Sequence, residues 1–298
     1  MTRLGMLSIC ALAATAPAGV HHDIIIVAGQ SNARTHYASG VLDAITASGQ
    51  FPSPVLFHRS HSGNAMSRWV SGQPGAYTLA ENFLSDFWSP DSLADLEALV
   101  AGIEAAGDTW DIAGFFWFQG EGDSGSETAT ARYNGRFMHM LNTLEAEFAL
   151  DHEIPFILTA IDYNGDDEAL ARQGRTPEDI EAIRAVQLDL GDSAAIGATH
   201  DSRGWPRLDV WHVGDRDDPR GIYAPLADMG AAQAAILLAL PQPLSRADLN
   251  ADGIHDLVDI NLFTDWFPAS DPRADLAPPA DVFDLADINA FTDAFLGR

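Results

Sequence analysis

The sequence predicts an α/β fold in which helices cover both faces of a parallel β-sheet. Short, fully apolar segments alternate with longer amphipathic segments between Asp23 and Leu240. The run Ile24-Ile25-Ile26-Val27 is typical of a strand that is buried on both faces, as strands of a parallel sheet are. Strand–helix alternation along the chain favours parallel pairing, because each helix returns the chain to the same end of the sheet.

The individual elements follow from these patterns. Strands are expected at 23–28, 54–57, 112–118, 155–161 and 194–199, and helices at 79–87, 92–106, 128–150, 177–190 and 223–240. Polar clusters directly follow all five strands, at 30–32, 58–64, 119–121, 162–164 and 200–201. Ligands of open α/β sheets bind beyond the carboxyl ends of the strands. We therefore expect the functional site at that edge.

Composition narrows the classes of partner. The chain has 298 residues, and its 16 basic side chains, all Arg, face 43 acidic ones, so its formal charge is −27. Hydrophobic residues make up 47%, which is typical of a globular protein. The negative charge argues against binding to nucleic acid or to an anionic membrane, because phosphates would be repelled. Sugars and divalent cations remain possible ligands.

The first 18 residues have the pattern of a secretory signal peptide. Arg3 precedes an apolar run, and Ala16-Pro17-Ala18 has the small-residue form of a cleavage site. We expect a secreted protein, extracellular or periplasmic, that lacks a disulfide framework because Cys10 is its single cysteine. No other run is long and apolar enough to predict a membrane span.

Three residues have the chemistry of a serine hydrolase. Ser31 follows the first strand at a turn that can expose its hydroxyl, which needs a base to act as a nucleophile. His212 is the best candidate for that base, because Asp209 lies three residues before it and can orient its ring. Each residue taken singly also has a structural interpretation, a helix N-cap for Ser31 and a surface loop residue for His212.

Together these residues resemble the SGNH hydrolases, in particular the carbohydrate esterases that include sialate O-acetylesterases and acetylxylan esterases. The similar blocks are Gly29-Gln30-Ser31-Asn32, Trp117-Phe118-Gln119-Gly120-Glu121-Gly122-Asp123 and Asp209-x-x-His212. The resemblance implies a flavodoxin-like three-layer α/β/α sandwich, which we assign to residues 19–240. It also implies hydrolysis of acetyl esters on carbohydrates, with no metal in the active site.

The resemblance also assigns roles to residues. It implies that Ser31 is the nucleophile, His212 the base and Asp209 its orienting acid. The oxyanion hole would consist of the Ser31 and Gly63 N–H groups and the side-chain amide of Gln119. Glu121 and Asp123 would brace the site loop, and two tryptophans that flank the Asp–His loop, Trp205 and Trp211, are candidates for stacking on a sugar.

Two other functions stay open from the sequence. One is a broad-specificity esterase or lipase for small or lipid esters, which a long apolar groove would favour. The other is a binding or surface-adhesion protein that keeps the fold without activity. The presence of all of Ser31, Asp209 and His212 argues against the second alternative.

The C-terminal region has a different composition and an internal repeat. After a short proline-containing linker at 241–245, residues 246–298 contain two similar twelve-residue segments, at 256–267 and 284–295, which are identical at nine positions. Such a repeat indicates one structural unit present twice.

The first repeat carries a calcium-loop pattern. Oxygen ligands are expected from Asp248, Asn250, Asp252, the Ile254 carbonyl, Asp256 and Asp259, with Gly253 at the sharp turn. The duplicated loop–helix resembles the dockerin family, which implies bound calcium and a cohesin-like or other cell-surface partner. The second loop, from Asp275, lacks several ligands and the glycine, so we expect a weak or absent site there.

Overall fold

A computed structural model describes residues 19–80, 92–194, 196–240, 247, 249, 257–269, 274, 283 and 285–296. Its centre is a five-stranded parallel sheet formed by β1 (His21–Gly29), β2 (Pro54–Ser60), β5 (Thr109–Phe118), β6 (Phe156–Ala160) and β7 (Gly197–Asp201). The strand order is β2-β1-β5-β6-β7. This is the flavodoxin-like order, with β1 and β5 at the switch point. The predicted α/β fold is confirmed.

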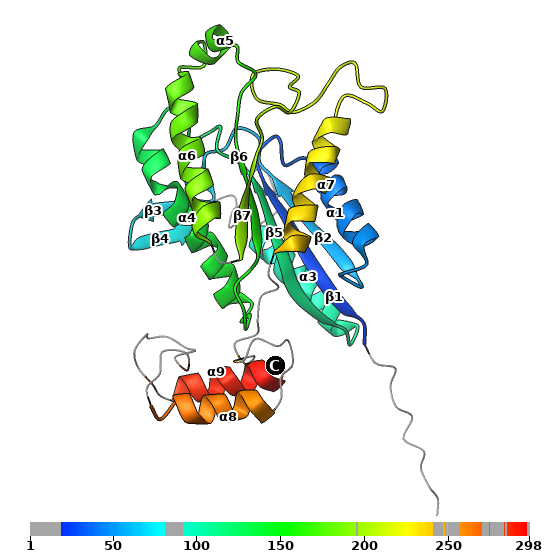
Figure 1. Ribbon diagram of the computed structural model, residues 1–298, viewed down its shortest axis with the longest axis vertical. Helices are drawn as coiled ribbons and strands as arrows, with labels where there is room; N and C mark the ends of the chain where they lie inside the picture. Colours follow the sequence, from blue (N-terminus) through cyan, green and yellow to red (C-terminus); the bar gives the residue numbers. More distant parts are fainter. Residues whose placement is uncertain are drawn as a thin grey trace, which may run out of the picture.

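Helices cover both faces of the sheet, as Figure 1 shows. The helices of this part of the chain are α1 (Thr35–Ser48), α3 (Ser92–Ala105), α4 (Glu127–Glu147), α5 (Asp167–Ala171), α6 (Pro177–Ser193) and α7 (Ala224–Ala239). Helices α1 and α7 pack together on one face, and α4 packs against α6 on the other (Figure 1). Within the described ranges, no helix has the length and apolar character needed to cross a membrane.

Local sequence explains where several helices begin. Helix α6 starts with a capping box, in which Thr176 and Asp179 bond each other's backbone N–H groups, and with Pro177 in its first turn. Helix α4 starts after Ser126, whose side chain accepts the Ala129 N–H. Both helices begin within one residue of the expected start.

The structure differs from the expected elements in several places. Helix α1 was not expected, although Tyr37, Val41 and Ile45 recur at four-residue spacing and are all buried. Leu79, expected to begin a helix, instead ends an antiparallel hairpin of β3 (Val70–Gln73) and β4 (Ala76–Leu79), and 81–87 lie outside the described residues. His200 and Asp201 form the end of β7 instead of following it.

An aromatic core supports the carboxyl ends of the central strands. Trp117 is fully buried at the end of β5, and its ring meets the equally buried Trp69 edge-on, with 5.0 Å between centroids. The Trp117 indole N–H donates to the Tyr133 hydroxyl of α4, which in turn donates to the Gln119 carbonyl. The core therefore fixes the backbone of the loop that carries the second motif block.

The C-terminal region contains a pair of helices with its own small core. Helices α8 (Leu257–Trp266) and α9 (Leu285–Leu296) occupy equivalent positions in the two repeats. The equivalent residues Phe263 and Phe291 stack with their ring centroids 4.2 Å apart. The equivalent carboxylates Asp259 and Asp287 are both fully buried. The repeat in sequence is thus a repeat in structure.

Candidate active site

A pocket of about 410 Å³ lies where the loops after β1, β2 and β5 meet the segments that follow β6 and β7. It is lined by Gln30, Ser31, Arg34, Ser62, Gly63, Glu121, Gly122, Gln173, Arg175, Trp211 and His212. The site is at the expected edge of the sheet. The polar clusters at 162–164 and 200–201 do not line it.

Ser31, His212 and Asp209 form one hydrogen-bonded chain. His212 Nε2 lies 2.9 Å from Ser31 Oγ, although the two residues are separated by 181 positions. His212 Nδ1 lies 2.7 Å and 3.0 Å from the two carboxylate oxygens of Asp209. With a proton on Nδ1, Nε2 is free to accept the hydroxyl proton of Ser31. This is the geometry of an activated serine nucleophile.

The Asp209 carboxylate is held by its own loop. Its Oδ1 accepts the backbone N–H groups of Trp211 and His212 at 2.9 and 3.0 Å. Partial burial tends to raise the Asp209 pKa, but these hydrogen bonds and the His212 ring outweigh it and hold the pKa below its ordinary value. Asp209 is therefore ionised at neutral pH and can orient the imidazole.

Asn32 holds the backbone on both sides of His212. Its Nδ2 donates to the Trp211 carbonyl at 3.1 Å, and its Oδ1 accepts the Val213 N–H at 3.1 Å. The same Nδ2 donates to Glu121 Oε1 at 2.9 Å. Asn32 was not among the residues expected to have a role in the site. The only signal was its position directly after Ser31, because its partners lie about 90 and 180 residues away.

Glu121 belongs to this buried network, as its expected bracing role requires. Its side chain is 4% exposed, and burial raises its pKa despite the hydrogen bond from Asn32. Arg207 lies on the loop that carries Trp211 and His212, and its buried guanidinium donates to the Trp211 carbonyl at 2.6 Å. Two donors, from Asn32 and Arg207, therefore fix the peptide group next to the histidine.

Asp123 links the loop after β2 to the loop after β5. It is fully buried, and its Oδ2 accepts the Met66 N–H at 2.7 Å and the Gln119 amide at 2.6 Å. Burial raises the Asp123 pKa against these hydrogen bonds. The contacts agree with the expected bracing role.

The structure contradicts the expected position of Gln119. Its side chain is fully buried and does not line the pocket. Its amide nitrogen donates to Asp123 and also lies 3.3 Å from Gln30 Oε1 and from the Asn64 carbonyl. These acceptors occupy both N–H groups, so the amide does not face the place of an oxyanion. Gln119 instead hydrogen-bonds to groups in the loops after β1, β2 and β5 and holds these loops together.

Two backbone N–H groups remain as candidate oxyanion donors. Ser31 and Gly63 both line the pocket, and within the described part of the chain neither N–H donates to a protein acceptor. Gly63 has a φ of +74°, a conformation that residues with a Cβ rarely adopt.

Gly29, at the end of β1, allows a close approach of two backbones. It has a φ of +142°, and a Cβ there would lie 2.2 Å from the Phe118 carbonyl oxygen. This close approach brings the loop after β1 next to the loop after β5.

Of the two tryptophans considered for sugar binding, only Trp211 lines the pocket. Its indole N–H donates to Gln173 Oε1 at 2.6 Å, which fixes the ring. Trp205 packs instead near His200, with 6.0 Å between the ring centroids.

A family model supplies an independent comparison. The model described as carbohydrate esterase, sialic acid-specific acetylesterase (SASA), matches residues 55–203. The chain belongs to this carbohydrate esterase family. The match includes Gly63 and the block Gln119–Asp123. It does not reach Ser31, Asp209 or His212, whose arrangement rests on the geometry described above.

Two solved structures are similar to this esterase. One, an X-ray structure of a protein from Arabidopsis thaliana, is 16% identical, with 73% of this chain and 98% of that chain covered and a TM-score of 0.49. The other, a putative platelet activating factor from Streptococcus pneumonia, is 11% identical, with 74% and 83% covered and a TM-score of 0.40. No curated protein matches the chain.

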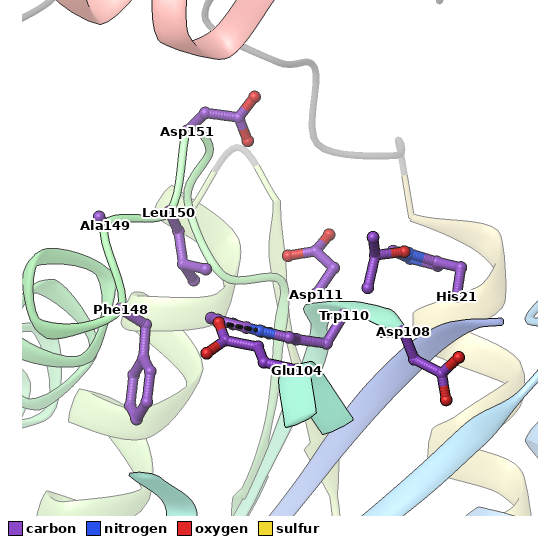
Figure 2. A pocket seen from close by; sticks show the side chains of 10 residues that line it. His21, Glu104, Asp108, Trp110, Asp111, Phe148, Ala149, Leu150 and Asp151 are labelled. Atoms are coloured by element: carbon purple, nitrogen blue, oxygen red, sulfur yellow. Dashed lines mark hydrogen bonds between the residues drawn. The ribbon is translucent and has the colours of Figure 1, made fainter. Parts of the chain in front are cut away.

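A second hollow of about 510 Å³ lies at the opposite, amino-terminal ends of β1 and β5, as shown in Figure 2. It lacks the chemistry of the pocket around Ser31, because polar groups of this hollow bond within the protein. Trp110 donates to Glu104 at 3.0 Å, Asp108 accepts the Val20 N–H at 2.7 Å, and Asp111 contacts His152 at 2.8 Å. We therefore interpret the acidic side chains of this hollow as structural.

The expected calcium ligands lie mostly outside the described residues. Asp248, Asn250, Asp252, Ile254 and Asp256 fall there, as do the expected signal peptide at 1–18 and the linker at 241–245. Asp259 is described, and its Oδ1 accepts the Leu249 N–H at 2.8 Å. Calcium binding stays a prediction.

Proposed function

We propose that this chain is a secreted serine esterase that removes O-acetyl groups from carbohydrates. The observation that carries the proposal is the hydrogen-bonded chain from Ser31 through His212 to Asp209 in a pocket at the sheet edge. Membership of the carbohydrate esterase family supports the sugar ester as substrate.

The first half of the reaction forms an acetyl-enzyme. Ser31 Oγ attacks the acetyl carbonyl carbon while its proton passes to His212 Nε2. Asp209 holds the ring and stabilises the imidazolium that forms. The carbonyl oxygen becomes an oxyanion, for which the Ser31 and Gly63 N–H groups are the candidate donors. Each preorganised donor of this kind lowers the barrier by about 3–4 kcal/mol.

The second half regenerates the enzyme. The tetrahedral intermediate collapses when His212 gives its proton to the sugar oxygen, and the free sugar hydroxyl leaves. A water molecule then loses a proton to His212 and attacks the acetyl carbon. Acetate leaves, and the proton returns from His212 to Ser31 Oγ. The balance is one water consumed for one acetate, one sugar hydroxyl and one proton produced.

Side chains that can hydrogen-bond to a sugar line the pocket. Of the eleven lining residues, most have polar or charged side chains, including Gln30, Arg34, Gln173 and Arg175. Secretion and a calcium-binding C-terminal module complete the proposal on the basis of the sequence patterns.

The test is acetate release from acetylated xylan and from an O-acetylated sialic acid by wild type and Ser31→Ala. We expect the variant to lose roughly 10⁴-fold or more in turnover, since the nucleophile is gone. Ser62→Ala is a suitable control, because Ser62 lines the same pocket without contacting His212; we expect less than about a tenfold change. Wild-type turnover in a correctly folded Ser31→Ala protein would refute the proposal.

A further inference from the structure

The hollow at the amino-terminal ends of β1 and β5 has the size of a ligand site (Figure 2). Its volume is about 510 Å³, against about 410 Å³ for the pocket around Ser31. Both volumes lie in the range of about 300–1,000 Å³ that is typical of small-molecule sites. None of the described residues lines both, so a ligand of the hollow would be bound separately from the ester.

A half-buried tryptophan of β5, Trp110, lies in this hollow. Figure 2 shows its ring edge-on, with Asp111 and Asp151 on one side of it. The indole N–H donates to Glu104 Oε1 of α3 at 3.0 Å, and the Phe148 ring meets the indole at 84° with 5.8 Å between the centroids. These two contacts fix the ring, so a ligand can pack on it with little loss of side-chain entropy.

Carboxylates beside the ring supply hydrogen-bond acceptors. Asp108 Oδ1 accepts the Val20 N–H at 2.7 Å, and Asp111 Oδ2 lies 2.9 Å from His152 Nε2. These bonds hold the walls of the hollow together and fix the carboxylates in place. Because a carboxylate offers about four acceptor sites, each of the two can still accept a hydroxyl group.

This combination of groups matches a neutral sugar better than an ion. A sugar ring has an apolar C–H face that packs on an aromatic ring, and its hydroxyls donate to acceptors around it. An anionic sugar would be repelled by the four carboxylates of the lining. An organic cation would compete with histidine, because Asp108 lies 3.2 Å from His22 Nε2 and Asp111 lies 2.8 Å from His152 Nε2.

We propose that this hollow binds a neutral sugar unit of a polysaccharide, with Trp110 as the surface on which the sugar stacks. The inference goes beyond the proposed function, because it assigns a second site that holds a neutral glycan whether or not it is acetylated. Binding of a polymer at this site raises the effective concentration of its acetyl groups near Ser31.

Binding of xylohexaose, a neutral oligosaccharide without acetyl groups, tests the site by calorimetry on the full chain. We expect wild type to bind it and Trp110→Leu to bind it at least about fivefold more weakly, because the flat stacking surface is lost. Trp211→Leu is the matched control, since Trp211 lines the pocket around Ser31 and not the hollow. Its affinity should stay that of wild type. No binding by wild type, or loss of binding in Trp211→Leu alone, would overturn the inference.

Inhibition of the wild-type enzyme gives a readout that does not depend on a variant folding. Xylohexaose at a saturating concentration should leave turnover of p-nitrophenyl acetate unchanged, because the hollow and the pocket around Ser31 are separate. Inhibition that follows the binding curve would place the sugar in the pocket and refute the second site. Absence of p-nitrophenyl acetate hydrolysis by wild type would instead refute the proposed function. The calorimetry would still stand, so the two failures are distinguishable.

Charged oligosaccharides of the same length test the assigned chemistry. The measurements are made in 0.3 M NaCl, which screens the net charge of the chain. We expect a galacturonate hexamer to bind at least about tenfold more weakly than xylohexaose, because the carboxylates of the hollow repel it. A glucosamine hexamer should also bind more weakly. Tighter binding of either charged hexamer that Trp110→Leu removes would overturn the assignment of the hollow to a neutral sugar.

Discussion

The proton on His212 is placed by one carboxylate, and this makes Asp209 a sharp test of the mechanism. Asp209→Asn keeps the shape of the side chain but can present an N–H to His212 Nδ1, which favours the tautomer with its proton on Nε2. That imidazole cannot accept the Ser31 proton. We expect turnover of p-nitrophenyl acetate to fall by about 10³- to 10⁴-fold with an unchanged circular dichroism spectrum. A variant within tenfold of wild type would exclude the assigned role.

Asn32 is the side chain that connects the nucleophile turn to the histidine loop. Asn32→Ala removes the bonds to the Trp211 carbonyl, the Val213 N–H and Glu121, and leaves buried polar groups unpaired. We expect kcat to fall roughly 10- to 100-fold with a smaller change in KM, because His212 is no longer held against Ser31.

A second buried amide provides the control for Asn32. Gln233 is fully buried and bonds Thr159 and Tyr37 in the packing between α1, α7 and β6, and it does not line the pocket. Gln233→Ala should lower the melting temperature as Asn32→Ala does while retaining kcat. Equal losses of kcat in both variants would show that Asn32 contributes stability alone.

At the scale of elements, an ion pair between a buried histidine and a half-buried aspartate joins β5 to the segment that leads into β6. His152 is buried, and its Nε2 lies 2.8 and 2.9 Å from the two oxygens of Asp111. Burial alone would lower the His152 pKa, but the hydrogen bond and charge of Asp111 outweigh it and raise the pKa to about 9. The free energy of unfolding therefore depends on the protonation of His152.

The sign of this linkage gives a prediction for stability. Because the folded-state pKa is above the ordinary value of 6.5, protonated His152 stabilises the fold fully below about pH 6.5. That contribution, about 3 kcal/mol, is lost as the pH rises through about 9. We expect His152→Gln to lower the urea-derived free energy of unfolding more at pH 6 than at pH 10. An equal difference at both pH values would contradict the linkage.

At the scale of the whole molecule, the two C-terminal repeats predict a calcium site that is separate from the esterase chemistry. The first loop has the full oxygen-ligand pattern from Asp248 to Asp259, and the second, from Asp275, does not. We expect calorimetry on the full chain to show one calcium site that Asp248→Ala with Asp252→Ala removes and that Asp275→Ala retains. No binding at millimolar calcium would refute the site. Esterase activity should be the same with and without chelator.

Strand and helix positions were predictable where a segment is uniformly apolar, as in 24–27, or carries a capping signal, as at Thr176 and Pro177. Helix α1 was missed because it contains Ser39, Gly40 and Thr46, which are weak helix formers, and because Gly40 lies on its buried face. Its packing against α7, a contact between distant segments, stabilises it in the fold.

The sequence by itself determined the α/β class, the edge of the sheet where the site lies and the three residues of the proposed triad, because periodicity and motif order are local properties of a chain. Only the tertiary structure decided which side chains reach the pocket. It places Gln119 on Asp123, Asn32 across His212, and Arg34 and Arg175 in the lining. The physical reason is that a buried polar group bonds to whatever acceptor the fold brings within about 3 Å, and those partners come from segments far apart in the chain.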